Sequence, residues 1–142
     1  QLADRADVRV LEAVVGAHRP LQLVNALVEL LPPQLALALG DLGRLFPDTD
    51  PRYKGASSLG LLRSVMDLIA TKGARVVNVD VTVICQAPRL APFLPEMAKR
   101  LAATMGLGSE RVSVKAKSPE HLGLLGREEG IASMAVVSVE TA

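Results

Sequence analysis

The sequence is poor in aromatic residues and in cysteine. Of its 142 residues only three are aromatic and tryptophan is absent, while 49% are apolar. The core must therefore be packed from Leu, Val, Ala and Ile. Cys85 is the sole cysteine, which excludes an intrachain disulfide and with it a small secreted fold held by disulfides. One cysteine and two histidines also exclude a cysteine-rich zinc module.

A strong net charge and a long hydrophobic run are also missing. Sixteen basic residues stand against fifteen acidic ones, which gives a net charge of +1. Nucleic acid is thereby excluded as a partner, because such binders usually show a basic patch with stacking aromatics. The most apolar stretch, residues 21–39, contains polar residues and two adjacent prolines, so it predicts a buried helix and not a membrane span. The first residues lack the pattern of a signal peptide. Length and composition predict one globular domain over residues 1–142.

Three segments show the three- and four-residue spacing of a helix face. The first, residues 21–31, should end or kink at the proline pair that follows it. The second, residues 61–69, can be capped by Ser57 or Ser58. The third covers residues 97–105. Each of the last two is followed by a glycine placed to end the helix.

Other segments alternate between apolar and polar residues, which is typical of half-buried strands. The clearest is residues 77–83, followed by residues 112–115 and 132–139. Residues 7–15 fit either a strand or a short helix, and we expect a strand. Helices that alternate with strands predict an α/β (α+β) fold, in which helices pack on one face of a mostly β-sheet layer.

The first of three candidate ligand loops lies within residues 40–56, which are rich in Gly, Asp and Pro. Two glycines allow a ligand to approach the backbone closely, and Asp41, Asp48 and Asp50 could bind a hydroxyl, a ribose or a cation. A solvated turn is the other interpretation, and composition alone favours it because these are ordinary turn residues.

The second and third candidate loops each follow a predicted strand. Residues 86–92 stand where many α/β proteins bind ligands, although a plain connection fits equally well. Residues 115–121 bring together two lysines, a serine and a glutamate, a set suited to a phosphate with a divalent ion. A charged surface loop is the alternative. Cys85 is more typical of a small buried residue than of a nucleophile, and His121 of a solvated loop residue.

All three loops belong to longer motifs, in a fixed order. These are Leu39-Gly-Asp-Leu-Gly-Arg-Leu-Phe-Pro-Asp-Thr-Asp-Pro, Asn78-Val-Asp-Val-Thr-Val-Ile-Cys-Gln-Ala-Pro-Arg-Leu, Val112-Ser-Val-Lys-Ala-Lys and Gly126-Arg-Glu-Glu-Gly-Ile-Ala. Together they resemble the 2-C-methyl-D-erythritol 2,4-cyclodiphosphate synthases of the non-mevalonate isoprenoid pathway. The resemblance runs without an evident gap from about residue 39 to residue 139.

The resemblance implies a homotrimer whose sheets face the trimer axis and whose active sites lie between neighbouring subunits. The implied reaction is the metal-dependent cyclisation of 4-diphosphocytidyl-2-C-methyl-D-erythritol 2-phosphate to the 2,4-cyclodiphosphate, with release of CMP. Zn²⁺ and Mg²⁺ or Mn²⁺ are the implied cofactors. The implied location is the bacterial cytoplasm or the plastid stroma.

Site residues are carried over by matching position. Asp41 and Ser118 would be catalytic, with Ser118 standing where the family has a threonine that stabilises the transition state. Substrate-binding residues would be Asp41, Gly43, Phe46, Pro47, Asp48, Thr49, Asp50, Lys117, Ser118, Glu120, Leu124 and Arg127, the pair Leu124 and Arg127 matching residues that line an axial cavity. The cytidine would be bound by Cys85, Gln86, Ala87, Pro88, Arg89, Leu90 and Ala91. Metal ligands would be Asp7, His18 and Glu120.

The first 38 residues depart from the zinc motifs of the family. Asp7 is followed by Arg9 where the family has a histidine, and His18 lacks the carboxylates that follow it in the family. Arginine cannot ligate a cation, so Asp7 and His18 alone leave zinc under-coordinated. Three interpretations follow: a synthase whose first third is misrepresented in this sequence, a non-catalytic relative that binds nucleotide or diphosphate or serves as an assembly subunit, or an α/β binding domain with coincidental motifs. The synthase is the favoured one.

Overall fold

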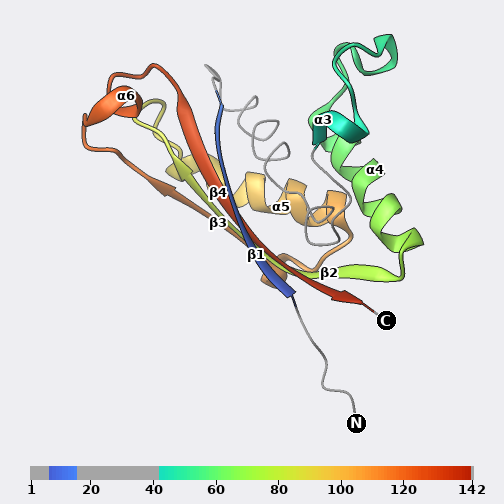
Figure 1. Cartoon of the computed structure of the whole chain (residues 1–142). Coiled ribbons are helices and arrows are strands. Elements are labelled where there is room, and N and C mark those ends of the chain that lie inside the picture. The colour runs from blue at the N-terminus through green and yellow to red at the C-terminus, as the bar shows by residue number, and fades with distance from the viewer. Residues whose placement is uncertain (1–6, 16–41, 142) are drawn as a thin grey trace.

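Four strands form one mixed sheet in the computed structural model, which describes residues 7–15 and 42–141 (Figure 1). They are β1 (Asp7–Val15), β2 (Ala74–Ile84), β3 (Val112–Lys117) and β4 (Ile131–Thr141), and they lie in the order β1-β4-β2-β3. The two strands β2 and β3 are parallel, whereas β4 is antiparallel to both of its neighbours. The strand expected at residues 7–15 is therefore confirmed.

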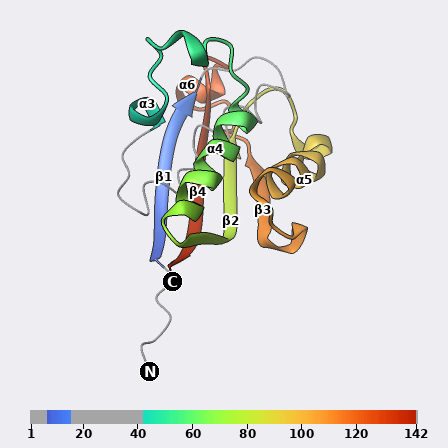
Figure 2. The same cartoon turned by 90° about the vertical axis from the view of Figure 1, so that its right-hand side faces the viewer.

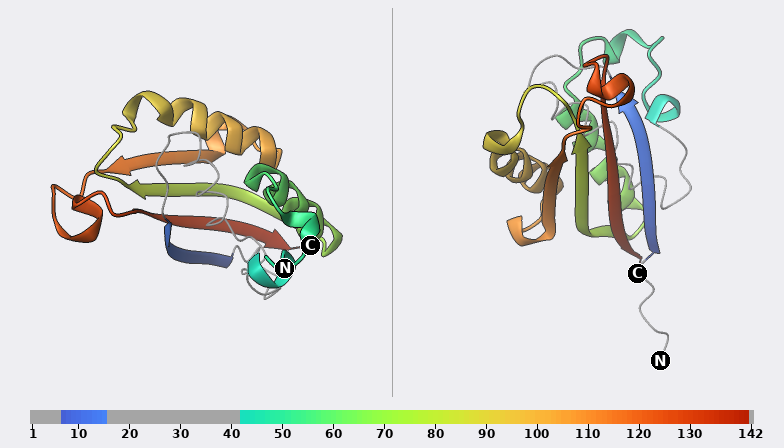
Figure 3. Two further views of the ribbon diagram at one scale, coloured as in Figure 1. Left: turned by 90° about the horizontal axis from the view of Figure 1, so that it is seen from above. Right: turned by 90° about the vertical axis from the view of Figure 1, so that its left-hand side faces the viewer.

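Two long helices, α4 (Ser58–Thr71) and α5 (Leu94–Met105), lie on one face of this sheet, as Figure 2 shows. The right-hand view in Figure 3 shows the opposite face, with the strands in front of both helices. Two one-turn helices, α3 (Leu42–Leu45) and α6 (Gly123–Gly126), lie in the connections. The α+β layer predicted from the sequence is confirmed. No helix in the described residues is long and apolar enough to cross a membrane.

An aliphatic core fills the space between the sheet and the helices. Alternate residues of β2 and β4 are buried, and their fully buried side chains pack against those of α4 and α5. The largest fully buried side chains are Leu62, Val65, Ile69, Val79, Val81, Val83 and Leu101. The expected alternation is wrong at Val77, because a bulge between Val76 and Asn78 shifts the register and leaves Val76 buried in its place.

The two predicted helices within the described residues form largely as expected. Ser57 occupies the N-cap position of α4, but its side chain makes no capping hydrogen bond. Met97, Leu101 and Met105 form the buried side of α5, which ends at Gly106 with the left-handed φ of 67° that favours glycine there. The helix expected at residues 21–31 lies outside the described residues.

The segment 40–56 is not a plain loop. It contains α3 and a 3-10 turn, η1 (Pro51–Tyr53), which is preceded by Asp50 as its N-cap. The side chain of Asp50 accepts a hydrogen bond from the backbone N–H of Arg52, as an N-cap does. The composition of this segment indicated only a loop, whereas its residues form two short helical turns.

Candidate functional site

The second and third candidate loops leave the sheet side by side. In the parallel pair β2 and β3, Ile84 is in register with Lys117, and the N–H of Cys85 donates to the carbonyl of Lys117 at 3.0 Å. The carboxyl ends of neighbouring parallel strands meet at one edge, where ligands often bind in α/β proteins. The structure therefore brings together two segments that are about thirty residues apart in the sequence.

A cavity of about 460 Å³ opens between these two loops. It is lined by Cys85, Gln86, Arg89, Leu90, Ala91, Ala116, Lys117 and Ser118. The lining includes five of the seven residues expected at the cytidine and two of those expected at the diphosphate. Among the described residues, two cationic side chains, Arg89 and Lys117, and no carboxylate line it, so the cavity suits an anionic ligand.

The thiol of Cys85 forms a buried part of the cavity wall. Its side chain is 7% exposed, and Sγ donates to the carbonyl of Ala87 at 2.9 Å. Burial raises the pKa of the thiol, so the thiolate is disfavoured. The geometry thus agrees with the expectation of a packing residue and not a nucleophile.

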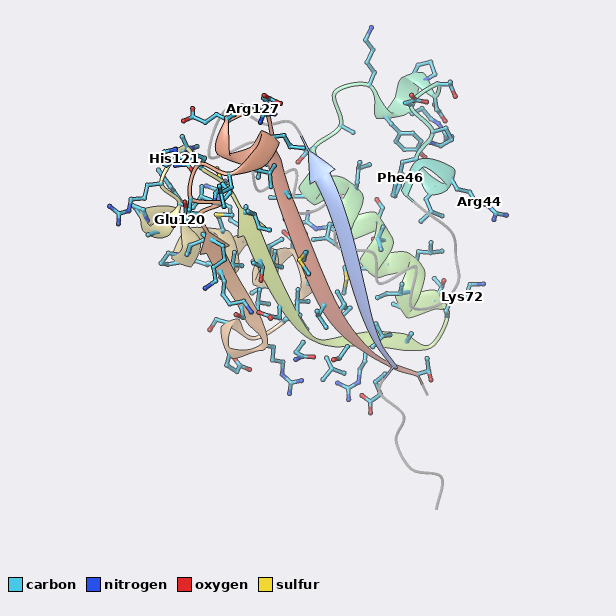
Figure 4. The ribbon with its side chains drawn as sticks, turned by 60° about the vertical axis from the view of Figure 1, so that its left-hand side comes forward. Arg44, Phe46, Lys72, Glu120, His121 and Arg127 are labelled. Carbon is cyan, nitrogen blue, oxygen red and sulfur yellow. The ribbon has the colours of Figure 1, made fainter. Side chains whose placement is uncertain are left out.

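Ser118 and Glu120 lie at the start of the connection between β3 and α6. The hydroxyl oxygen of Ser118 accepts a hydrogen bond from the backbone N–H of Glu120 at 3.0 Å. Figure 4 places the labelled Glu120, His121 and Arg127 at the same end of the sheet. Arg127 directly follows α6, and its guanidinium donates to Glu129 at 2.5 Å, while Leu124 on α6 is exposed. The charged residues Glu120, Arg127 and Glu129 therefore lie on the surface beyond the cavity, together with the exposed apolar side chain of Leu124.

The first candidate loop lies away from the other two loops in space. Figure 4 shows Arg44 and Phe46 on the far side of the sheet from Glu120 and His121. The substrate-binding residues expected in this region stand on α3 and the turn that follows it, and they are Gly43, Phe46, Pro47, Asp48, Thr49 and Asp50. The described part of one chain does not assemble all three loops into one site. Asp41 lies outside the described residues.

The carboxylate of Asp50 makes hydrogen bonds within the first loop. It accepts hydrogen bonds from the side chain of Arg52, the shortest 2.6 Å long, and from the backbone N–H of the same residue. The hydrogen bonds from the Arg52 side chain hold the pKa of Asp50 below its usual value. Phe46 and Tyr53 meet edge to face with ring centroids 5.2 Å apart. Asp50 therefore shapes the loop, whatever else it contacts.

The three metal ligands implied by the resemblance are not brought together by the described residues. His18 lies outside them. Asp7 begins β1 and is in register with Val139, at the opposite end of the sheet from Glu120. Among the side chains that the structure describes, those of residues 43–141, no three His, Cys, Asp or Glu are grouped so as to hold a metal ion. These residues of one chain do not fit a complete metal site.

One contact between the two cavity loops was not expected from the sequence. The side-chain oxygen of Gln86 accepts a hydrogen bond from the backbone N–H of His121 at 3.0 Å. The residues are 35 positions apart, so no local pattern could have indicated that they meet. His121 is indeed exposed, as expected of a loop residue, but its backbone is tied to the cavity wall.

Together, the fold and the cavity define a small α+β domain with a cavity, lined by two cationic side chains, at the carboxyl ends of two parallel strands. The chain belongs to the YgbB family, to which its residues 23–140 match. The resemblance to the cyclodiphosphate synthases is thereby confirmed, and the interpretation of coincidental motifs is wrong.

Several curated relatives are 2-C-methyl-D-erythritol 2,4-cyclodiphosphate synthases. The chain is 53% identical to that of Geobacter sulfurreducens over 105 residues, which cover 74% of this chain and 67% of the relative. It is 53% identical to the Agathobacter rectalis protein over 73% of this chain and 59% of the relative. For the Thioalkalivibrio sulfidiphilus protein the identity is 55%, over 75% of this chain and 66% of the relative. The aligned part thus spans about two thirds or less of these relatives.

Solved structures share the fold. The bifunctional IspDF of Campylobacter jejuni matches with a TM-score of 0.85 and 30% identity, over 99% of this chain and 43% of that one. A 2C-methyl-D-erythritol-2,4-cyclodiphosphate synthase in a CDP-bound form matches with a TM-score of 0.77 and 26% identity, over 94% of this chain and 99% of that one.

Proposed function

We propose that the chain is a cyclodiphosphate synthase that converts 4-diphosphocytidyl-2-C-methyl-D-erythritol 2-phosphate into 2-C-methyl-D-erythritol 2,4-cyclodiphosphate and CMP. The observation that carries the proposal is the cavity between the loops after β2 and β3, which unites the expected cytidine segment with Lys117 and Ser118. The family membership and the CDP-bound relative support the same ligand class. Residues 1–142 would act as one domain, in the cytoplasm or the plastid stroma.

The chemistry needs no protein nucleophile. An oxygen of the substrate's own 2-phosphate attacks the β-phosphorus, and the bond from that phosphorus to the bridging oxygen of CMP breaks, so CMP leaves with that oxygen. Lys117 would neutralise the diphosphate, and the hydroxyl of Ser118 would donate a hydrogen bond to the charge that grows in the transition state. Residues 85–91 would hold the cytidine and fix the geometry of attack.

The proposed assembly is a homotrimer. In a single chain Phe46 lies across the sheet from Glu120 and His121 (Figure 4), so the methylerythritol end of the substrate would need this loop from a neighbouring subunit. An assembly in which each site takes loops from two copies satisfies this requirement. Asp41, Gly43, Pro47, Thr49, Leu124 and Arg127 keep their proposed substrate contacts within such an assembly.

Zn²⁺ and Mg²⁺ or Mn²⁺ are the proposed cofactors, with Asp7, His18 and Glu120 as candidate ligands. Such ions would supply charge neutralisation to the phosphates. Among the described residues, Glu120 lies two positions after Ser118 of the cavity wall, which supports Glu120 as one of these ligands.

Nucleotide binding and CMP release test the proposal separately. Saturating CDP should raise the melting temperature, because a ligand at 100 times its Kd stabilises the folded state by about 2.7 kcal/mol. The variant Lys117→Ala should lose most of that rise. Lys72→Ala is the matched control, since Lys72 is exposed at the end of α4, away from the cavity (Figure 4). An unchanged melting temperature with CDP would refute the cavity assignment.

The CMP-release assay, with a measurement of bound zinc, then separates two kinds of protein. Release of CMP and formation of the cyclic product would support the synthase. The gene should be resequenced first to verify the chain. A verified chain that binds CDP but holds no zinc and releases no CMP would instead be a non-catalytic relative that binds the nucleotide.

A further inference from the structure

The connection between β3 and α6 contains a turn whose backbone conformation is unfavourable for residues other than glycine unless other contacts stabilise it. Glu120 and His121, neither of them glycine, have φ values of 52° and 63°. The N–H of Leu122 donates to the carbonyl of Pro119 at 3.0 Å and closes the turn. Two successive positive φ values are typical of type I′ turns, which favour Asn and Gly at these positions. Such a conformation persists only where the surroundings impose it.

Hydrogen bonds from two directions impose it here. On the near side, the N–H of Glu120 donates to the hydroxyl oxygen of Ser118 at 3.0 Å. On the far side, the N–H of His121 donates to the side-chain oxygen of Gln86 at 3.0 Å, and the side-chain nitrogen of Gln86 lies 3.4 Å from Nε2 of His121. Both central amides of the turn are therefore matched, the second by a residue from the other loop.

Packing holds the turn from behind. Gly126 on α6 is buried, and a Cβ atom at that position would overlap the backbone carbonyl of His121. Only glycine allows this close approach. The turn is thus fixed between the backbone of α6 and the side chain of Gln86.

We propose that Gln86 is a positioning residue, which holds the Pro119–Leu122 turn and thereby sets where Ser118 and Glu120 lie beside the cavity. Gln86 and Ser118 both line that cavity, so the hydrogen bond to His121 ties its two walls together. The oxygen of Ser118 already accepts from Glu120, which leaves the hydroxyl proton free to be donated to a phosphate. This inference rests on the proposed function, and it assigns Gln86 a task beyond contact with cytidine.

The test compares three variants of the full chain. Gln86→Met keeps the length and removes the acceptor, whereas Gln86→Glu keeps an acceptor oxygen. His121→Asn is the matched control, because it removes the imidazole but keeps the backbone N–H and tolerates a positive φ. Amide hydrogen exchange, followed by NMR without nucleotide, reports the His121 hydrogen bond directly. The kcat and KM of CMP release report its effect on the reaction.

The proposal predicts that the backbone amide at position 121 exchanges about tenfold faster or more in Gln86→Met, and at close to the original rate in Gln86→Glu and His121→Asn. It also predicts that Gln86→Met lowers kcat by about tenfold while KM changes little, because the transition-state contacts of Ser118 are displaced. Unchanged exchange in Gln86→Met would overturn it. A raised KM with unchanged kcat would also overturn it, since Gln86 would then only bind substrate.

Two further outcomes stay informative. Should the unaltered chain release no CMP, the proposed function fails, and the exchange measurement alone decides whether Gln86 holds the turn. Should Gln86→Met not fold, Gln86→Asn replaces it, because its shorter side chain withdraws the acceptor from His121. Faster exchange there supports the proposal, and exchange at the original rate contradicts it.

Discussion

The first loop and the cavity loops carry candidate residues of one proposed site, yet they are held in different ways. In the first loop, Phe46 contacts Tyr53 and Asp50 contacts Arg52, so the partners are at most seven positions apart. In the cavity loops, Gln86 contacts His121 across 35 positions. The printed polar and ring contacts of the first loop are local, although Leu45 and Phe46 also pack against the hydrophobic core, whereas the cavity exists only where the sheet and helices bring distant segments together.

This difference determines how far a perturbation should spread. A change in the first loop should alter its own rings and charges and leave the cavity intact. A change in the core beneath β2 and β3 should disturb the cavity, because the positions of both its loops depend on the same packed layer. Tyr53 is the only tyrosine and tryptophan is absent, so intrinsic fluorescence reports the first loop alone.

The largest effect is expected for Leu101→Ala. Leu101 lies on α5 and is fully buried, so the truncation should cost about 2–5 kcal/mol of the free energy of unfolding. Denaturant titration followed by circular dichroism measures this. Lys99→Ala, on an exposed position of the same helix, should change stability by less than about 0.5 kcal/mol. Equal stability of the two variants would contradict the view that this layer supports the cavity.

The next effect concerns the reactivity of Cys85. Because its thiol is buried and its pKa is raised, alkylation at pH 8 should be about tenfold slower or more than in the unfolded chain. Saturating CDP should slow it further, since a ligand in the cavity covers this wall. Mass spectrometry of the timed reaction measures both rates. Alkylation that is as fast in the native chain as in denaturant would contradict the buried position.

A smaller effect is expected where β2 and β3 are linked on the sheet surface. Lys115 donates to Asp80 at 2.5 Å, and this hydrogen bond lowers the pKa of Asp80. The folded-state pKa lies below the unfolded value of about 3.9, so the stabilisation is present at neutral pH and is lost as the pH falls through the lowered pKa. Both side chains are more than a third exposed, which limits the contribution to about 0.5 kcal/mol.

Lys115→Met tests this pair. The variant should be less stable than the original chain at pH 7, and the difference should shrink as the pH falls through the lowered pKa of Asp80, as urea titrations at several acidic pH values would measure. Lys72→Met should show no such pH-dependent difference. A difference that persists undiminished at low pH would mean that Lys115 stabilises the sheet by packing and not through Asp80.

The smallest and most local effect is expected for Arg52→Leu. Without the Arg52 hydrogen bonds, the pKa of Asp50 should rise toward its ordinary value, which NMR titration measures. The guanidinium carbon of Arg52 lies 5.5 Å from the ring centroid of Tyr53, so the fluorescence of Tyr53 should change as well. The rise in melting temperature caused by CDP should stay the same. A weakened response to CDP would show that the two regions are coupled in solution.

Sequence patterns predicted the regular elements that rest on local periodicity. The alternation in β2 and the spacing of Met97, Leu101 and Met105 in α5 were sufficient, because each element buries one side against the same layer. They failed at Val77, where a bulge set by pairing with β4 changes which side chain is buried. They also missed α3, a single turn too short to show a period.

The candidate site likewise contains residues that the sequence identified and residues that only the structure revealed. Motifs identified Lys117, Ser118 and residues 85–91 through their resemblance to a family, and the cavity gathers most of them. The roles of Gln86 and Gly126 had no such signal, because a hydrogen bond across 35 positions and a backbone-to-backbone contact depend on how β3 and α6 are placed.

By itself the sequence determined an aliphatic α+β domain, its helical and extended segments, its family, and the residue types that would meet an anionic nucleotide. It could do so because periodicity, turn chemistry and motifs are properties of neighbouring residues. The tertiary structure alone decided that the loops after β2 and β3 share one cavity, that the first loop lies apart from it, and that Gln86 holds the Glu120–His121 turn. Those facts follow from strand order and register, which arise from long-range packing and are not contained in any short stretch of the chain.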